Sequence, residues 1–134
     1  MKVDLKFTIY NLIPLTKDDG INQFVPHCDT IQKILERDKS IEGYLKKHRV
    51  GKTEQEKIDD YNNRILPNYI DSCAGQSVAT YILGIGDRHL ENLMITKDGI
   101  LFHIDFGFIF GKEPNNFKQK LSSRRGLQTE AIAT

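Results

Sequence analysis

Apolar and polar residues alternate near the N-terminus. Asp, Lys and Thr separate the apolar positions Val3, Leu5, Phe7 and Ile9. A two-residue period is typical of a half-buried strand, so we expect a strand here that Pro14 stops. The polar sequence 17–20 predicts a turn, and residues 21–25 then predict a second short strand.

The next segments have the period of helices. Asp29 is placed to cap a helix with an apolar face at Ile31, Ile34 and Leu35. Ser40 is placed to cap another helix over 41–48, and the polar stretch 49–63 predicts a solvated loop running into a surface helix. Pro67 should break the pattern before the strongest helix begins.

That strongest helix carries an apolar stripe with small residues between its members. The stripe consists of Ile70, Cys73, Ala74, Ser77, Val78, Tyr81 and Ile82. We expect it to be buried, and we expect Gly84 and Gly86 to end the helix. The Asp98–Gly99 pair then predicts a β-hairpin between residues 93–95 and 100–104.

Composition narrows the class of protein. The 134 residues are 39% hydrophobic and 28% charged, which suits one soluble globular domain. Nineteen basic and eighteen acidic residues nearly balance, so the net charge gives no indication of nucleic-acid binding. Apolar runs are too short for a membrane-spanning helix, and the charged N-terminus argues against a secretory signal. Cys28 and Cys73, each in an apolar helical pattern, are expected to be reduced packing residues.

Positive charge gathers at the C-terminal end. From Lys112 onward there are five basic and two acidic residues. The segment is interpreted either as a surface for anionic lipid or as a solvated tail.

Two polar clusters, residues 86–92 and 103–107, flank the predicted hairpin. The hairpin should return Asp105 to the loop holding Asp87, His89 and Asn92. Magnesium prefers oxygen ligands such as those of Asn92 and Asp105, and a carboxylate or imidazole can deprotonate an attacking hydroxyl. Alone, Asp87 reads as a salt-bridge partner and His89 as a structural histidine. Together, D-R-H-x-x-N and H-I-D-F-G indicate phosphoryl transfer, with the H-R-D triplet of protein kinases inverted.

The chain resembles a known enzyme family. Residues 72–75, 81–89 and 101–107 are similar to the catalytic core of phosphatidylinositol 3-kinases, and 3–10 and 20–25 resemble the strand before the hinge and the hinge. The resemblance covers roughly 3–118. It implies an α+β fold, the incomplete, mainly helical C-terminal lobe of a protein-kinase-like lipid kinase with a small β-hairpin. Residues 119–134 depart from the family and are expected to be a disordered tail.

Short stretches favour one branch of the family. Residues 23–24, 40–42, 90–92 and 111–114 resemble the class III, vacuolar-sorting type. A phosphatidylinositol 4-kinase or an atypical protein kinase stays open as an alternative, as does an inactive interaction fragment.

The resemblance implies a role for each residue of the two clusters. Asp87 and His89 would activate the lipid hydroxyl or steady the γ-phosphate of ATP, while Arg88 braces the loop. Asn92 and Asp105 would hold Mg²⁺ or Mn²⁺. The hinge residues Gln23, Phe24 and Val25 would contact adenine, and the activation loop would include Asp105, Phe106, Gly107 and Lys112.

The same resemblance implies the setting of the protein. The substrate would be phosphatidylinositol in endosomal and autophagosomal membranes, reached from the cytoplasm and with a regulatory subunit as partner. The phosphate-binding loop and lysine of the family's N-terminal lobe have no counterpart in these residues, and neither do its C-terminal helices. The isolated chain is therefore expected to be inactive and to expose apolar helix faces.

Overall fold

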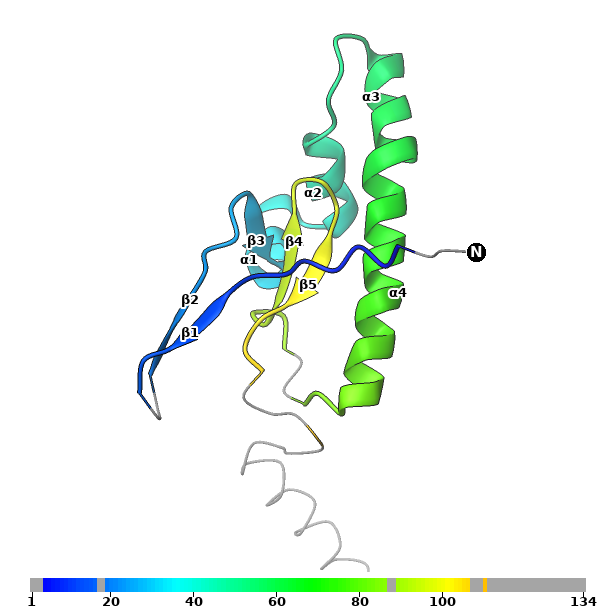
Figure 1. Cartoon of the computed structure of the whole chain (residues 1–134). Coiled ribbons are helices and arrows are strands. Elements are labelled where there is room, and N and C mark those ends of the chain that lie inside the picture. Colours follow the sequence, from blue (N-terminus) through cyan, green and yellow to red (C-terminus); the bar gives the residue numbers. More distant parts are fainter. Residues whose placement is uncertain (1–3, 17–18, 87–88, 107–109, 111–134) are drawn as a thin grey trace, which may run out of the picture.

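Two small antiparallel sheets and a long helical rod make up the fold (Figure 1). The structure is a computed structural model that describes residues 4–16, 19–86, 89–106 and 110. Strand β1 (Leu12–Pro14) pairs with β2 (Gly20–Asn22). The second sheet has the order β3 (Cys28–Thr30), β4 (Leu93–Thr96), β5 (Leu101–His103).

The helices surround this second sheet. Helices α1 (Ile31–Asp38) and α2 (Ile41–Lys47) follow β3. Helix α3 (Glu54–Asp60), the π-helical segment η1 (Tyr61–Ile65) and α4 (Leu66–Leu83) follow one another without a gap. They form the continuous column of Figure 1, with the β4–β5 hairpin beside it.

Side-chain caps explain where the shorter helices begin. The hydroxyls of Thr30, Ser40 and Thr53 each accept a hydrogen bond from the backbone N–H three residues on. The Thr53 N–H in turn donates to a carboxylate oxygen of Glu56, which completes a capping box. The cap at Ser40 confirms its prediction. The first helix is capped one residue later than expected, by Thr30, the last residue of β3.

The hydrophobic core lies where α1, α2, η1 and β4 meet. Its buried members are Ile31, Ile34, Tyr44, Leu45, Ile65 and Ile95. The two short helices and the rod therefore hold β4 between them, and β4 carries the candidate site at its start.

The predicted N-terminal strand is wrong. The described residues 4–11 form no strand, and β1 begins only at Leu12 and includes Pro14. Leu5 and Phe7 lie against α4 instead, close enough that a Cβ atom on Gly75 would meet the Leu5 Cβ atom at 2.8 Å. The apolar residues Leu5 and Phe7 therefore belong to an irregular segment that crosses the rod, with a left-handed φ of 51° at Lys6 between them. The second strand is also shorter than expected, because β2 ends at Asn22.

The helix continues through Pro67, which was expected to break it. The N–H of Leu66 bonds to the carbonyl oxygen of Tyr61, five residues back, so the hydrogen-bond pattern has already changed when the chain reaches Pro67. A proline lacks the N–H that an α-helix interior needs. The π turn accommodates that loss at the point where the pattern shifts.

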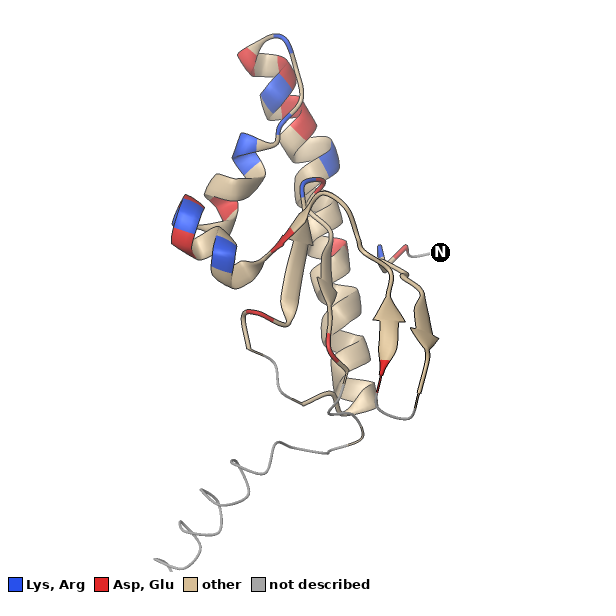
Figure 2. Cartoon of the chain, turned by 90° about the vertical axis from the view of Figure 1, so that its left-hand side faces the viewer, with Lys and Arg blue, Asp and Glu red and all other residues tan. Residues whose placement is uncertain are grey.

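Burial of the apolar stripe on α4 is also a wrong prediction. Ile70, Val78, Tyr81 and Ile82 are all exposed, and Tyr81 keeps 89% of its surface. Figure 2 shows charged residues gathered on α1, α2 and α3, whereas α4 is nearly uncharged. An apolar face of α4 thus meets solvent.

The β4–β5 hairpin confirms its prediction. Leu93 pairs with His103 and Ile95 with Leu101, and Gly99 in the turn has a positive φ of 88°. Gly84 ends α4 with a left-handed conformation, also as predicted. The sequence did not indicate β3, where Cys28 lies in a strand and not in a helix. Both cysteines are free thiols.

Residues 119–134 and the basic segment from Lys112 lie outside the described residues. Among the helices that the structure describes, none is long and apolar enough to cross a membrane.

Candidate nucleotide and metal site

The hairpin brings Asn92 and Asp105 to the same end of the sheet. The N–H of Ile104 donates to the carbonyl oxygen of Asn92 at 3.0 Å, one position before Asp105. Asn92 is buried at 6% exposure, and Asp105 has a left-handed φ of 58° that turns the chain immediately after the strand pair. The two residues that the sequence assigned to a metal ion are therefore neighbours across the hairpin.

His89 belongs to the turn that leads into Asn92. The Asn92 N–H donates to the carbonyl oxygen of His89 at 3.0 Å. The exposed His89 ring faces a carboxylate, with 3.9 Å between its Nδ1 and Oε2 of Glu91. Imidazole and amide thus share one tight turn. Asp87, Arg88, Gly107 and Lys112 lie outside the described residues, so their predicted roles stay predictions.

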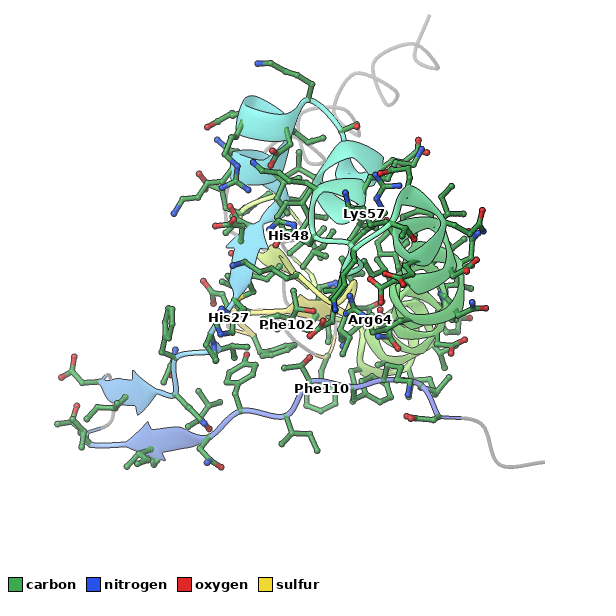
Figure 3. The ribbon with its side chains drawn as sticks, turned by 90° about the horizontal axis from the view of Figure 1, so that it is seen from above. His27, His48, Lys57, Arg64, Phe102 and Phe110 are labelled. Atoms are coloured by element: carbon green, nitrogen blue, oxygen red, sulfur yellow. The ribbon has the colours of Figure 1, made fainter. Side chains whose placement is uncertain are left out.

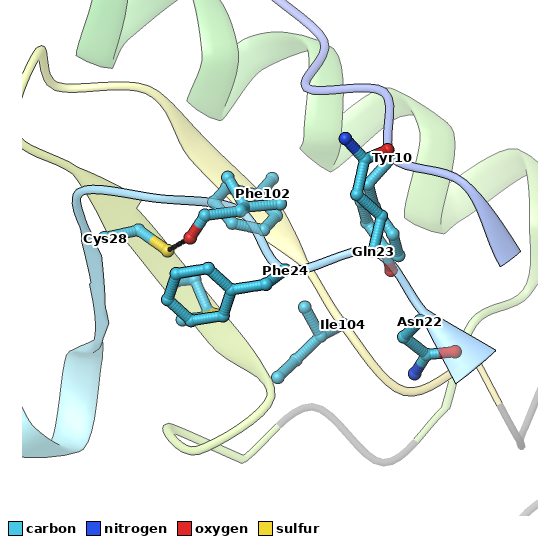
Figure 4. A pocket seen from close by; sticks show the side chains of 9 residues that line it. Tyr10, Asn22, Gln23, Phe24, Cys28, Phe102 and Ile104 are labelled. Carbon is cyan, nitrogen blue, oxygen red and sulfur yellow. Dashed lines mark hydrogen bonds between the residues drawn. The ribbon is translucent and has the colours of Figure 1, made fainter.

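A pocket of about 240 Å³ joins the predicted hinge to this end of the sheet (Figure 4). Gln23, Phe24 and Val25 of the predicted hinge line it together with Phe102 and Ile104. The remaining lining residues are Tyr10, Asn22, Cys28 and Met94. A mostly apolar pocket with a few polar backbone groups suits a flat heterocycle. It opens beside Ile104, the residue before Asp105.

Backbone hydrogen bonds hold the hinge segment in place. The Gln23 N–H donates to the Asn11 carbonyl oxygen at 2.8 Å, and the Asn11 N–H donates to Oε1 of Gln23 at 3.0 Å. Phe24 is 81% exposed at the pocket rim. The hinge is thereby tied to the segment that precedes β1.

Cys28 is a pocket residue that sequence reasoning missed. Its Sγ donates to the carbonyl oxygen of Val25 at 3.0 Å, the dashed line in Figure 4. Burial, followed by the nearby Asp29 carboxylate, raises the pKa of the Cys28 thiol. The thiol is therefore protonated and slow to react at neutral pH.

Tyr10 was also missed, although it reaches the end of β5. Its hydroxyl donates to the carbonyl oxygen of His103 at 3.3 Å, and its ring lies 6.3 Å from that of Phe102. Burial raises the pKa of Tyr10 above its usual value, and the negative charge of Asp105 raises it further. Tyr10 therefore senses the charge at the candidate metal site.

The ring of His103 makes a buried contact with α4. Its Nδ1 lies 2.6 Å from Oε1 of Gln76, and both side chains are buried. His103 belongs to the H-I-D-F-G motif, but the sequence pattern assigned it no role. The sequence around Gln76 did not indicate this contact, because its partner His103 lies 27 residues further along the chain.

The donor set fits a metal ion shared with phosphate groups. Among residues 4–16, 19–86, 89–106 and 110, no group of three His, Cys, Asp or Glu side chains could hold a metal ion by itself. Mg²⁺ is typically held by one or two protein oxygens together with substrate phosphates. The amide of Asn92 and the carboxylate of Asp105 suit that kind of site.

Known proteins are similar to this chain in sequence. The family model for phosphatidylinositol 3- and 4-kinase matches residues 43–124. Phosphatidylinositol 3-kinase VPS34 of Saccharomyces cerevisiae is 44% identical over 115 residues, covering 86% of this chain and 13% of the yeast protein. The Arabidopsis thaliana protein of the same name is 43% identical over 115 residues, with 86% and 14% covered.

A relative from another branch is also similar. Phosphatidylinositol 4-phosphate 3-kinase C2 domain-containing subunit alpha of Pongo abelii is 38% identical over 117 residues, covering 81% of this chain and 6% of that protein. The chain thus spans about one seventh or less of the relatives it matches. With the family model covering more than half of its residues, the chain belongs to the phosphatidylinositol 3- and 4-kinase family.

Proposed function

We propose that this chain is the hinge and C-terminal-lobe segment of a phosphatidylinositol 3-kinase, which transfers the γ-phosphate of ATP to the 3-hydroxyl of phosphatidylinositol. The observation that carries the proposal is the pocket between the hinge and the hairpin end. Its apolar walls suit adenine, and Asn92 and Asp105 lie at the end of the same hairpin, where the phosphates of a bound nucleotide would follow.

Each described residue then has a task in nucleotide binding. Backbone groups of Gln23 and Val25 hydrogen-bond the adenine edge, while Phe24, Phe102 and Ile104 enclose the ring. Asn92 and Asp105 hold Mg²⁺ or Mn²⁺, which, when bound, neutralises the phosphate charge that develops during transfer.

The catalytic loop supplies the proton acceptor. Asp87 or His89 takes the proton of the inositol 3-hydroxyl as its oxygen bonds to the γ-phosphorus, and the bond to the β,γ-bridging oxygen breaks to release ADP. Arg88 braces the loop. A backbone hydrogen bond that joins His89 and Asn92 in one turn supports this assignment.

The setting follows the same proposal. Relatives named phosphatidylinositol 3-kinase VPS34 support the class III branch. We propose a regulatory subunit as partner and the cytoplasmic face of endosomal and autophagosomal membranes as the location. Lys112 and the following basic residues would approach the anionic lipid surface.

The test replaces the aligned segment of the Saccharomyces cerevisiae enzyme with residues 4–118 of this chain. We expect the chimera to form phosphatidylinositol 3-phosphate from ATP and phosphatidylinositol liposomes. Asp105→Asn should abolish turnover, whereas Glu36→Gln, a change of an exposed carboxylate on α1, should retain it. A folded chimera that forms the 4-phosphate, or no product, contradicts the proposal.

A further inference from the structure

Polar side chains at four-residue intervals face the hairpin from the rod. They are Arg64, Asn68, Ser72 and Gln76, the first in η1 and the others on α4. We call them the polar ladder. A four-residue interval returns to nearly the same side of a helix, so the ladder follows one face.

The first two members hold the hairpin turn. Arg64 donates to the carboxylate of Asp98, and Nδ2 of Asn68 donates to the Asp98 carbonyl oxygen at 3.1 Å. Figure 3 shows Arg64 on the side of the rod that faces the hairpin. Gly99 packs so closely that a Cβ atom there would lie 2.5 Å from the Ile65 carbonyl oxygen. The turn is therefore fixed against η1.

The last two members hold β5. The N–H of Leu101 donates to Oγ of Ser72 at 2.9 Å, and Gln76 contacts the His103 ring. Four helical residues rise about 6.0 Å, and two strand residues rise about 6.8 Å. A step of four along α4 thus matches a step of two along β5, so both contacts form in one register.

Gln76 is the ladder residue nearest the candidate metal site, through its contact with His103. His103 pairs with Leu93, the residue after Asn92, and stands two residues before Asp105. With the Gln76 amide oxygen facing the ring, Nδ1 of His103 is the protonated nitrogen and donates the hydrogen bond. A hydrogen bond between two buried side chains has a defined length and direction.

We propose that Gln76 is a positioning residue for the metal site, which through the His103 ring holds Ile104 and Asp105 in register with Asn92. The metal role of Asn92 and Asp105 rests on the proposed function. The register itself does not, so the two parts can be tested separately on the full 134-residue chain.

Amide exchange tests the register. Gln76→Met keeps the side-chain length and removes the amide oxygen. We expect the Ile104 amide, which bonds to Asn92, to exchange about ten-fold faster after correction for the change in global stability, because a buried hydrogen bond is lost. The Thr96 amide at the far end of the hairpin should not change. Gln76→Glu keeps an acceptor and should restore slow exchange.

Ser72→Ala is the matched control on the next ladder position. It should accelerate exchange at Leu101 and leave Ile104 unchanged. If Gln76→Met does not fold, Gln76→Asn, which is shorter by one methylene group, provides the same comparison. Unchanged exchange at Ile104 in the folded Gln76 variant, or an equal change in Ser72→Ala, overturns the proposal.

Manganese binding tests the link to the metal site. With ATP present, Mn²⁺ should broaden the amide signals of Asn92 and Asp105, and Gln76→Met should raise the Mn²⁺ concentration required by at least about ten-fold. Ser72→Ala should leave it unchanged. Faster Ile104 exchange without any Mn²⁺ broadening in the unsubstituted chain supports the register and contradicts the proposed function. Broadening that Gln76→Met leaves unchanged overturns the positioning role.

Discussion

The hydroxyl of Tyr10 and the carbonyl oxygen of His103 are joined by a hydrogen bond of 3.3 Å across 93 residues of sequence. This bond ties the segment before the hinge to the strand end that precedes Asp105. Because Asp105 contributes to the raised pKa of Tyr10, a partly buried phenol in the wall of the pocket reports on the charge at the proposed metal site.

Removing the Asp105 charge should therefore lower the pKa of Tyr10. We expect Asp105→Asn to shift it partway toward 10, with burial maintaining the rest of the elevation. ¹³C NMR of the tyrosine Cζ carbons follows the titrations of Tyr10 and Tyr44 in one sample. Tyr44, whose pKa burial raises to about 12, is the internal control. An unaltered Tyr10 titration would show that the carboxylate does not act on it.

ATP should protect Cys28 from alkylation but not Cys73. Both thiols are half-buried with raised pKa values, yet only Cys28 lines the pocket. With iodoacetamide and mass spectrometry of the separate peptides, Mg²⁺–ATP should slow the labelling of Cys28 several-fold. Equal protection of both cysteines would indicate a global effect, and protection of neither would contradict an adenine site here.

Alkaline pH should destabilise the chain through its buried tyrosines. Burial raises the pKa of Tyr44 from 10.0 to about 12, so the fold favours the neutral phenol. Its contribution is complete below pH 10 and is lost as pH rises toward 12, by about 2–3 kcal/mol at most. The free energy of unfolding, measured with urea between pH 10 and pH 12, should fall less steeply with pH for Tyr44→Phe than for the unsubstituted chain. An identical slope in the variant would remove Tyr44 as the cause.

Acid should weaken the joint between α3 and η1. Hydrogen bonds from Arg64, at 2.7 and 2.8 Å, are the main reason that the pKa of Asp60 lies below 3.8. The ionised Asp60 carboxylate therefore stabilises the fold at any pH above the pKa of the unfolded chain. This stabilisation is lost as the pH falls through the lower pKa of the folded chain. Asp60→Asn should cost about 1 kcal/mol at pH 7 and less at pH 3. Gln55→Ala, on the same helix, leaves the ion pair between Arg64 and Asp60 in place and is the control.

The exposed apolar face of α4 should bind hydrophobic dye. Tyr81 and Ile82 keep 89% and 72% of their surface. Replacing both with Gln should lower anilinonaphthalene sulfonate fluorescence and change the free energy of unfolding by less than about 0.5 kcal/mol. Val50→Ser, at an exposed apolar position away from α4, should leave the fluorescence unchanged. Dye binding that persists in the Gln variant would place the apolar surface elsewhere.

Local chemistry explains which elements could be predicted from sequence. The Asp98–Gly99 pair marks a turn because Gly99 adopts a positive φ, and Ser40 marks a helix start because its hydroxyl satisfies a backbone N–H. Both signals lie within a few residues of the structure they specify. The hairpin, and with it the approach of Asp105 to Asn92, follows from the Asp98–Gly99 turn.

The missed elements depend on contacts between distant segments. The sequence 28–30 has no strand pattern, and β3 forms because the backbone of β4 is available for pairing. The alternation of Leu5 and Phe7 resembled a strand, but their packing partner is Gly75 of α4. Gln76 and Tyr10 gained their roles in the same way, through partners 27 and 93 residues away.

The π-helical segment η1 also takes up one residue. Its hydrogen bond spans five residues where an α-helix spans four, so η1 holds one residue more than a plain α-helical turn. Deleting one residue from Tyr61–Ile65 and restoring a plain α-helix would therefore change the facing of α3 relative to α4 only slightly, and Tyr61 would stay on the core side. Deleting one residue within α4, between Asn68 and Gln76, would instead rotate one part of the ladder by about 100° against the other, because no wider turn absorbs the change there.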